Sequence, residues 1–188
     1  MQHRSAAPPA PTAVALAGAL MMAAAMGIGR FAYTPLLPPL QETLGWSVSQ
    51  AGDVAAANFL GYMIGALVAA TLAHRPERRL WLAAGMLASA ASTAAGAVVV
   101  SFAAWLSIRF ASGVASAFCL VLGTAAVVEH ITMQGRAQLG ALHFAGVGLG
   151  IVGSVAVLEC ARLAGVSMFG QWGRSASAQH CCSAPRGA

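Results

Sequence analysis

Two arginines, Arg30 and Arg109, lie in long stretches that carry no other charged residue. No charge stands between Arg4 and Arg30, and Arg109 is the sole charge between Arg79 and Glu129. Placing a lone guanidinium in the middle of a lipid bilayer costs at least about 2.5 kcal/mol on insertion scales. Such a residue is retained where it faces a partner, a cavity or a ligand. The two arginines therefore predict a polar pathway inside a membrane protein.

The chemistry open to Arg30 and Arg109 is the binding of an anionic group. Asp53 is expected at a similar depth and would neutralise one arginine if their helix faces meet, which leaves about one uncompensated positive charge. Tyr33, on the same helix face as Arg30, and Asn58, near the level of Asp53, could line the same cavity. The alternative is structural: each arginine extends to the interface or hydrogen-bonds to backbone carbonyls.

Composition assigns the chain to the membrane proteins. Of its 188 residues, 59% are hydrophobic and 8% are charged, and the mean hydropathy is +0.74. A soluble domain carries roughly a quarter charged residues, so this chain has too few polar side chains to cover a soluble core. The net charge is +5, but no basic patch is interleaved with aromatic residues, which argues against nucleic-acid binding. The lipid bilayer is therefore the expected partner of most of the surface.

The elements that position these residues are five apolar stretches, each near the length of about 20 residues that a membrane span needs. We expect an all-α polytopic membrane protein with transmembrane helices over residues 12–37, 53–73, 80–100, 104–128 and 139–160. Residues 1–11 are a tail, 12–172 the helical bundle and 173–188 a polar tail. The first stretch is longer than the apolar region of a signal peptide, so we interpret it as an uncleaved span.

The predicted loops alternate in charge. The first loop holds Pro35, Pro38, Pro39 and Glu42 but no arginine, and Ser47 with Gln50 resembles a capping box that opens the next helix. The third and fourth spans are expected to be joined by a turn over 101–105, where Trp105 suits a membrane interface. Basic residues precede the first span and fall in the loops near 74–79 and 130–136. The positive-inside rule then places the N-terminus in the cytoplasm, with the chain integral to the plasma (inner) membrane.

Other polar residues and glycines have two interpretations each. Glu129 is expected at the cytoplasmic end of its span, on the same side as Arg75, Arg78, Arg79 and Arg136, where it would act as a structural clamp between loops rather than couple protons. His143 is a packing or interhelical hydrogen-bonding residue on one view and a proton carrier on the other. Gly61 and Gly65 form a GxxxG pattern that indicates close helix packing, or alternatively allows helices to rock during transport.

Catalytic chemistry has no support in the sequence. It contains no GxSxG, HExxH or P-loop pattern, and its four cysteines lack the spacing of a metal site. We therefore expect no enzyme activity, no catalytic residues, no metal and no cofactor.

Three segments carry a family resemblance. They are GIGRFAYTPLLP at 27–38, AANFLGYMIGA at 56–66 and GALHFAGVGLG at 140–150. Together they resemble the major facilitator superfamily, specifically its YbfB/YjiJ-like branch, over residues 12 to 172. The resemblance implies twelve spans in two six-helix halves, of which this chain supplies most of the N-terminal half, with the solute between the halves.

The resemblance also implies roles for particular residues. Arg109 and Gly113 fit an RxxxG pattern of the fourth span that is linked to proton coupling. Glu77, Arg78 and Arg79 lie where the superfamily has a gating loop, but the Asp-Arg pair and glycine of that loop are missing. The fifth span lacks the Gly-Pro pair typical of antiporters, which weakly disfavours drug antiport.

The function expected from these observations is secondary active transport of a small solute by alternating access, coupled to an ion such as the proton; the two arginines favour an anionic solute. The chain would be a truncated form of such a transporter, and its polar tail is either genuine or out of frame. A different class stays open: a non-transporting membrane remnant, or a small subunit that pairs with another chain through its glycine faces. In either case the partner is the missing C-terminal half or a further helical chain.

Overall fold

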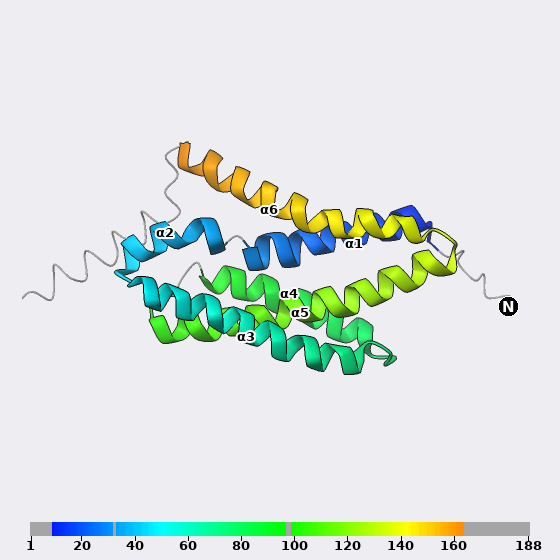
Figure 1. The fold of residues 1–188 in the computed structure, drawn as a ribbon, viewed down its shortest axis with the longest axis horizontal. Coiled ribbons are helices and arrows are strands. Elements are labelled where there is room, and N and C mark those ends of the chain that lie inside the picture. Colours follow the sequence, from blue (N-terminus) through cyan, green and yellow to red (C-terminus); the bar gives the residue numbers. More distant parts are fainter. Residues whose placement is uncertain (1–8, 32, 97–98, 164–188) are drawn as a thin grey trace, which may run out of the picture.

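A computed structural model describes residues 9–31, 33–96 and 99–163, which form an elongated bundle of helices (Figure 1). The helices are α1 (Pro11–Met22), a π-helical segment (Ala23–Phe31), α2 (Tyr33–Leu44), α3 (Val48–Leu72), α4 (Arg78–Gly96), α5 (Phe102–Met133), a short 3-10 turn (Ala137–Leu139) and α6 (Gly140–Leu163). The expected all-α fold is confirmed. Residues 1–8 of the predicted N-terminal tail, the end of the predicted bundle and the polar tail over 173–188 lie outside the described residues.

Four helical stretches in the described residues are long and apolar enough to cross a membrane: Pro11–Leu44, Val48–Leu72, Phe102–Met133 and Ala137–Cys160. The helix α4, expected over 80–100, is not among them, because two arginines at its start and several serines and glycines lower its hydropathy. It nevertheless packs along α5 inside the bundle (Figure 1).

The first span continues much further than the sequence suggested. The prolines assigned to a loop, Pro35, Pro38 and Pro39, lie within α2, which ends at Leu44. Pro35 is in the first turn, where backbone N–H groups have no intrahelical partner in any helix. Prolines deeper in a membrane helix are tolerated because neighbouring groups satisfy the freed carbonyls. The expectation of a proline-rich loop here was wrong.

The loop between α2 and α3 is short because two local signals act in succession. Gly45 has a φ of +67°, a left-handed conformation that glycine adopts without steric cost. The capping box is confirmed, since the Gln50 backbone N–H donates to Ser47 Oγ at 3.2 Å and the Ser47 N–H donates to Gln50 Oε1 at 3.0 Å. This cap makes α3 begin at Val48, before the expected residue 53.

The connection between α4 and α5 also precedes its expected position. Helix α4 ends at Gly96 and α5 begins at Phe102, so the expected turn over 101–105 lies largely inside α5. Trp105, expected at an interface, is buried and donates its ring N–H to the Val99 carbonyl at 2.9 Å. Its ring packs edge-on against Trp46.

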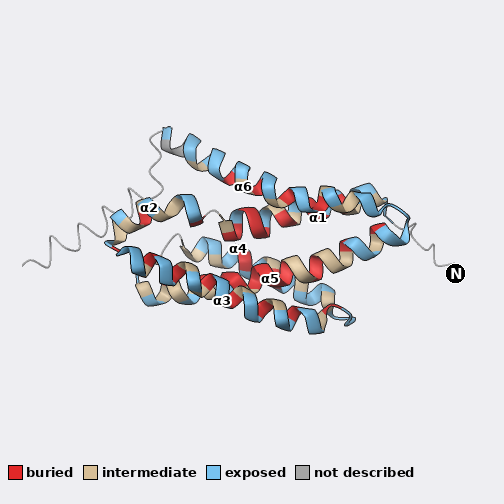
Figure 2. Ribbon diagram, in the orientation of Figure 1, coloured by how far each residue is buried: buried red, intermediate tan, exposed pale blue. Residues whose placement is uncertain are grey.

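Glycines allow the helices to approach closely, and α5 is the most buried helix (Figure 2). A methyl group on Gly61 would collide with the Phe110 backbone, and one on Gly65 would press on Val114, so α3 crosses α5 on its GxxxG face. Gly146 meets the backbone of Ala19 in the same way, where α6 lies against α1. The packing interpretation of the GxxxG pattern is confirmed.

Candidate functional site

Arg109 lies in the first half of α5 and its side chain crosses to the first span. It is only 8% exposed, with Nη1 donating to the Gly29 carbonyl at 3.4 Å and Nη2 donating to the Arg30 carbonyl at 3.1 Å. Its Nε is buried without a hydrogen-bond partner among the described residues. Part of the structural alternative is thus realised, because this arginine does bond backbone carbonyls.

The carbonyls that Arg109 reaches belong to the π-helical segment. Ser112, three residues further along α5, donates its hydroxyl to the same Gly29 carbonyl at 3.2 Å. π-Helical turns are rare and occur frequently at functional sites. Here α5 supplies the donors that hold such a turn in the middle of the first span.

Arg30 projects from the π-helical segment into a group of aromatic rings. It is 8% exposed, and its guanidinium carbon lies 3.9 Å from the centroid of the Tyr62 ring and 5.1 Å from that of Phe59. Phe31 adds a third ring at 5.6 Å. The electron-rich faces of these rings attract the cation. Phe59 is 62% exposed, so this aromatic shell reaches the surface of the bundle.

Tyr33 and Asn58 both join the site, but on Arg109 rather than Arg30. The Arg109 guanidinium lies 4.6 Å from the Tyr33 ring centroid, and the Tyr33 hydroxyl donates to the Ala51 carbonyl at 3.4 Å. Asn58 is buried and donates its side-chain N–H to the Arg109 carbonyl at 2.9 Å. Arg30 itself lies in the π-helical segment, which ends at Phe31, so the three-residue spacing of a regular α-helix does not describe its position relative to Tyr33.

Asp53 is not brought into the site. It is exposed on α3, and no carboxylate of the described residues pairs with Arg30 or Arg109. Two guanidinium groups are therefore buried with aromatic and carbonyl partners and without a counter-ion. The sequence had suggested that Asp53 would neutralise one of them; the structure shows no such pair in the described part of the chain.

The remaining candidate residues divide between the site and one end of the bundle. Gly113 follows Arg109 by about one turn of α5, and a methyl group on Gly113 would collide with the Asn58 backbone. Far from it, Arg78 at the start of α4 bonds Glu129 on α5 at 2.5 Å. Glu77 and Arg79 are exposed beside this ion pair. The ion pair connects α4 to α5, whereas a clamp between two loops was expected.

Several members of the site were not singled out from the sequence, among them Tyr62 and Ser112. Tyr62 follows Asn58 by four residues, and Ser112 follows Arg109 by three. Each therefore shares a helix face with a residue that was singled out from the sequence. That spacing was the available signal. It needed knowledge of which face of α3 and of α5 points inward.

Comparison with known proteins agrees with this architecture. A family described as "Uncharacterised MFS-type transporter YbfB" matches residues 22–180. The chain belongs to the YbfB family of MFS-type transporters. It is thus an integral membrane protein of a transporter family, and the resemblance seen in its sequence motifs is confirmed.

Two curated proteins show how much of such a transporter the chain represents. It is 33% identical over 150 residues to a "Chloramphenicol resistance protein" of Streptomyces lividans, covering 79% of this chain and 36% of that protein. It is 34% identical over 93 residues to the "Uncharacterized MFS-type transporter YceJ" of Bacillus subtilis (strain 168), covering 50% of this chain and 24% of that protein. The chain therefore matches about a third or less of the length of these relatives. No solved structure matches it significantly.

Proposed function

We propose that this YbfB-family chain provides part of a secondary transporter for a small anionic solute, and that Arg30 binds the anionic group. The observation that carries the proposal is the burial of two guanidinium groups that have no carboxylate partner within the described part of the chain. A buried unpaired charge is costly, so a site of this kind is stabilised by a ligand of opposite charge. An anion placed among Arg30 and its aromatic rings would supply that charge.

The two arginines take different parts in this proposal. Arg109 is held by the Gly29 and Arg30 carbonyls and acts as a positioning residue for the π-helical turn. Among the described residues the Arg30 guanidinium lies against the rings of Phe59 and Tyr62, and we propose that a solute accepts hydrogen bonds from it. Tyr33 and Asn58 hold Arg109 in place from α2 and α3.

The complete activity needs more chain than is described here. In transporters built from two helical halves, the solute lies between the halves and alternating access moves one half against the other. We propose that a second half, on this or another chain, covers the face on which Phe59 is exposed, and that transport is coupled to an ion. We further propose that the N-terminus is cytoplasmic and the membrane is the inner membrane, because basic residues gather in the loops at that end.

The relative named for chloramphenicol resistance favours a second candidate function, the export of an uncharged aromatic drug. The aromatic rings around Arg30 would stack on such a molecule. The absence of a Gly-Pro pair in the fifth span argues weakly against drug antiport.

A binding experiment distinguishes the two solute classes. The purified chain in lipid nanodiscs is titrated with a panel of small organic carboxylates and phosphates, and separately with chloramphenicol, while tryptophan fluorescence is recorded. Trp105 packs against Tyr33 and so reports on the site. We expect a carboxylate or phosphate to change the fluorescence, and Arg30→Gln to weaken its binding at least about tenfold, which corresponds to about 1.4 kcal/mol.

The matched control is Arg79→Gln, which removes an exposed arginine from the other end of the bundle. It should leave anion binding unchanged. Binding of chloramphenicol alone would support the second function, and equal weakening by both substitutions would refute a specific role for Arg30. Solute uptake into proteoliposomes by this chain alone would contradict the need for a second half.

A further inference from the structure

His143 on α6 is a fully buried polar side chain that the arginine site does not use. It is 0% exposed, its ring packs on Phe144 with centroids 5.0 Å apart, and its Nε2 lies 3.1 Å from the Thr124 hydroxyl of α5. Its Nδ1 abuts Gly18 of α1 and has no well-formed hydrogen bond among the described residues. A side chain larger than hydrogen at Gly18 would occupy the space of the ring.

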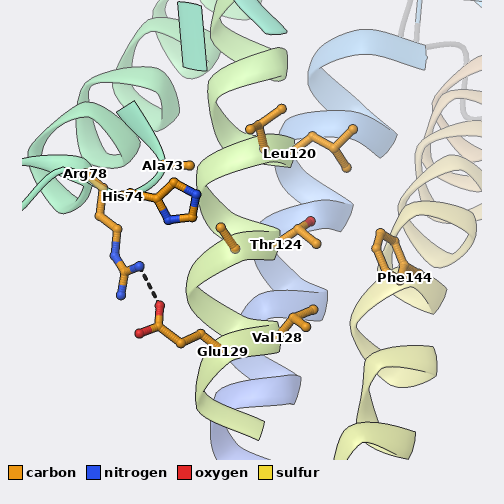
Figure 3. A pocket seen from close by; sticks show the side chains of 10 residues that line it. Ala73, His74, Arg78, Leu120, Thr124, Val128, Glu129 and Phe144 are labelled. Carbon is orange, nitrogen blue, oxygen red and sulfur yellow. Dashed lines mark hydrogen bonds and ion pairs between the residues drawn. The ribbon is translucent and has the colours of Figure 1, made fainter. Parts of the chain in front are cut away.

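Thr124 and Phe144, which both contact this ring, also line an open groove of about 800 Å³ (Figure 3). The groove runs along α5 between the end of α3 and the start of α6. One end of the groove is lined by His74, Arg78 and Glu129. Figure 3 shows the ion pair between Arg78 and Glu129 at this end. The Thr124 hydroxyl therefore contacts the buried imidazole on one side, while Thr124 lines the groove on the other.

Within the residues that the structure describes, no charged side chain is hydrogen-bonded to His143. Helix α1 has no titratable residue. On α5, Glu129 pairs with Arg78, and His130 bonds the Pro9 carbonyl, so neither side chain is bonded to His143. Also on α5, Cys119 is a buried thiol five residues before Thr124. The turn before α6 carries the exposed Arg136, and Glu159 follows His143 on α6 by 16 residues, about 24 Å along the axis.

We propose that His143 is a proton-binding residue that exchanges its proton with solvent in the groove through the Thr124 hydroxyl. Arginine does not release its proton in proteins, whereas an imidazole changes charge near neutral pH. His143 is the one buried histidine in the described residues. The proposal deepens the ion coupling proposed above and depends on it only for the role of the proton in transport.

The bound proton changes the direction of one hydrogen bond. In the neutral ring, Nε2 without hydrogen accepts from the Thr124 hydroxyl. When solvent supplies a proton, both ring nitrogens carry hydrogen, so Nε2–H donates to the Thr124 oxygen and the Thr124 hydrogen turns toward another acceptor. Release returns the proton to solvent in the groove. Since α1, α5 and α6 all contact this ring, its charge would weaken their packing.

The test is a histidine NMR titration of the complete chain in lipid nanodiscs, with the ring nitrogens labelled, between about pH 4 and pH 9. His143→Gln identifies the His143 signal by its loss. We expect this signal to titrate, and Thr124→Val to slow its proton exchange by about tenfold or more. Thr124→Ser, which keeps the hydroxyl, should restore exchange, and Thr132→Val, an exposed hydroxyl on the same helix, should have no effect.

A His143 signal that stays neutral across this range would overturn the proposal, as would unchanged exchange in Thr124→Val. If His143→Gln does not fold, the four other histidines are replaced by glutamine, which leaves His143 as the one labelled residue. The readout requires no solute, so it succeeds or fails independently of anion binding at Arg30.

Discussion

Arg109 organises the site through the planar fork of its guanidinium. Two of its nitrogens donate to successive carbonyls of the π-helical segment, while Tyr33 covers one face of the group. A lysine has one ammonium centre and cannot match two carbonyls in this fixed geometry. The charge of Arg109 is thus separable from its hydrogen-bonding role.

Arg109→Lys keeps the positive charge and removes the fork. We expect the free energy of unfolding to fall by about 1–3 kcal/mol, since hydrogen bonds from charged groups contribute about 1.5–3 kcal/mol each and lysine retains part of that. The measurement is unfolding of the purified chain in mixed micelles by increasing SDS. Arg79→Lys, exposed at the other end, should change nothing; an equal loss in both would contradict the role of the fork.

Tyr62 holds Arg30 through the face of its ring, which lies closest to the guanidinium. Tyr62→Phe keeps a ring and should preserve most of the stability. Tyr62→Leu should lower it further, by about 0.5–2 kcal/mol for a cation–π contact. In an Arg30→Met background the difference between Phe and Leu at position 62 should largely disappear in the same SDS assay. A difference that persists there would assign the effect to packing alone.

At the scale of elements, the crossing of α3 and α5 determines which residues meet. Gly61, Gly65 and Gly113 bring the two backbones together, and this approach lets Asn58 reach the Arg109 carbonyl. The atoms that face Gly113 are backbone atoms of α3, which cannot rotate away as a side chain would.

Gly113→Ala should therefore separate α3 from α5 and lower the free energy of unfolding by about 1–3 kcal/mol, the usual cost of an overpacked contact. The matched control is Gly148→Ala on α6, where no atom lies near the added methyl group. That change should be neutral or stabilising, because alanine favours helix over glycine. SDS unfolding of both variants provides the comparison, and similar losses would argue against a specific crossing.

At the scale of the whole molecule, three charged or polar segments gather at one end of the bundle. His130 bonds the Pro9 carbonyl at 3.0 Å, which joins the end of α5 to the start of α1. The ion pair of Arg78 with Glu129 adds the α3–α4 loop to the same end. The α2–α3 turn at Gly45 lies at the other end, as Figure 1 shows.

This arrangement predicts opposite accessibility for Glu77→Cys and Glu42→Cys, each made after the four native cysteines are replaced by serine. With a cytoplasmic N-terminus, a membrane-impermeant maleimide should label the cysteine at position 42 in intact cells. It should label the cysteine at position 77 only after the cells are broken. The reverse pattern would invert the proposed topology, and equal labelling would contradict a transmembrane bundle.

The sequence by itself determined the class of protein and drew attention to its unusual residues. The low charge and the long apolar stretches indicate that the bilayer is the solvent of this chain. In a bilayer, a single apolar segment can hydrogen-bond all of its own backbone N–H and C=O groups as an α-helix. The capping box at Ser47 and the GxxxG pattern at Gly61 were also readable, because both depend on residues within a few positions of each other. The isolation of Arg30 and Arg109 needed no knowledge of their neighbours.

The tertiary structure decided what those residues contact. Tyr33 packs against Arg109 and not against Arg30, and α5 brings Arg109 to the π-helical segment from about 80 positions away in the chain. Asp53 faces outward, although its depth suggested a partner for an arginine. The depth of a side chain in the membrane follows from counting residues along its helix. The direction in which the side chain points depends on how that helix is rotated about its axis. That rotation is set by contacts between distant glycines and backbones, which no local pattern contains.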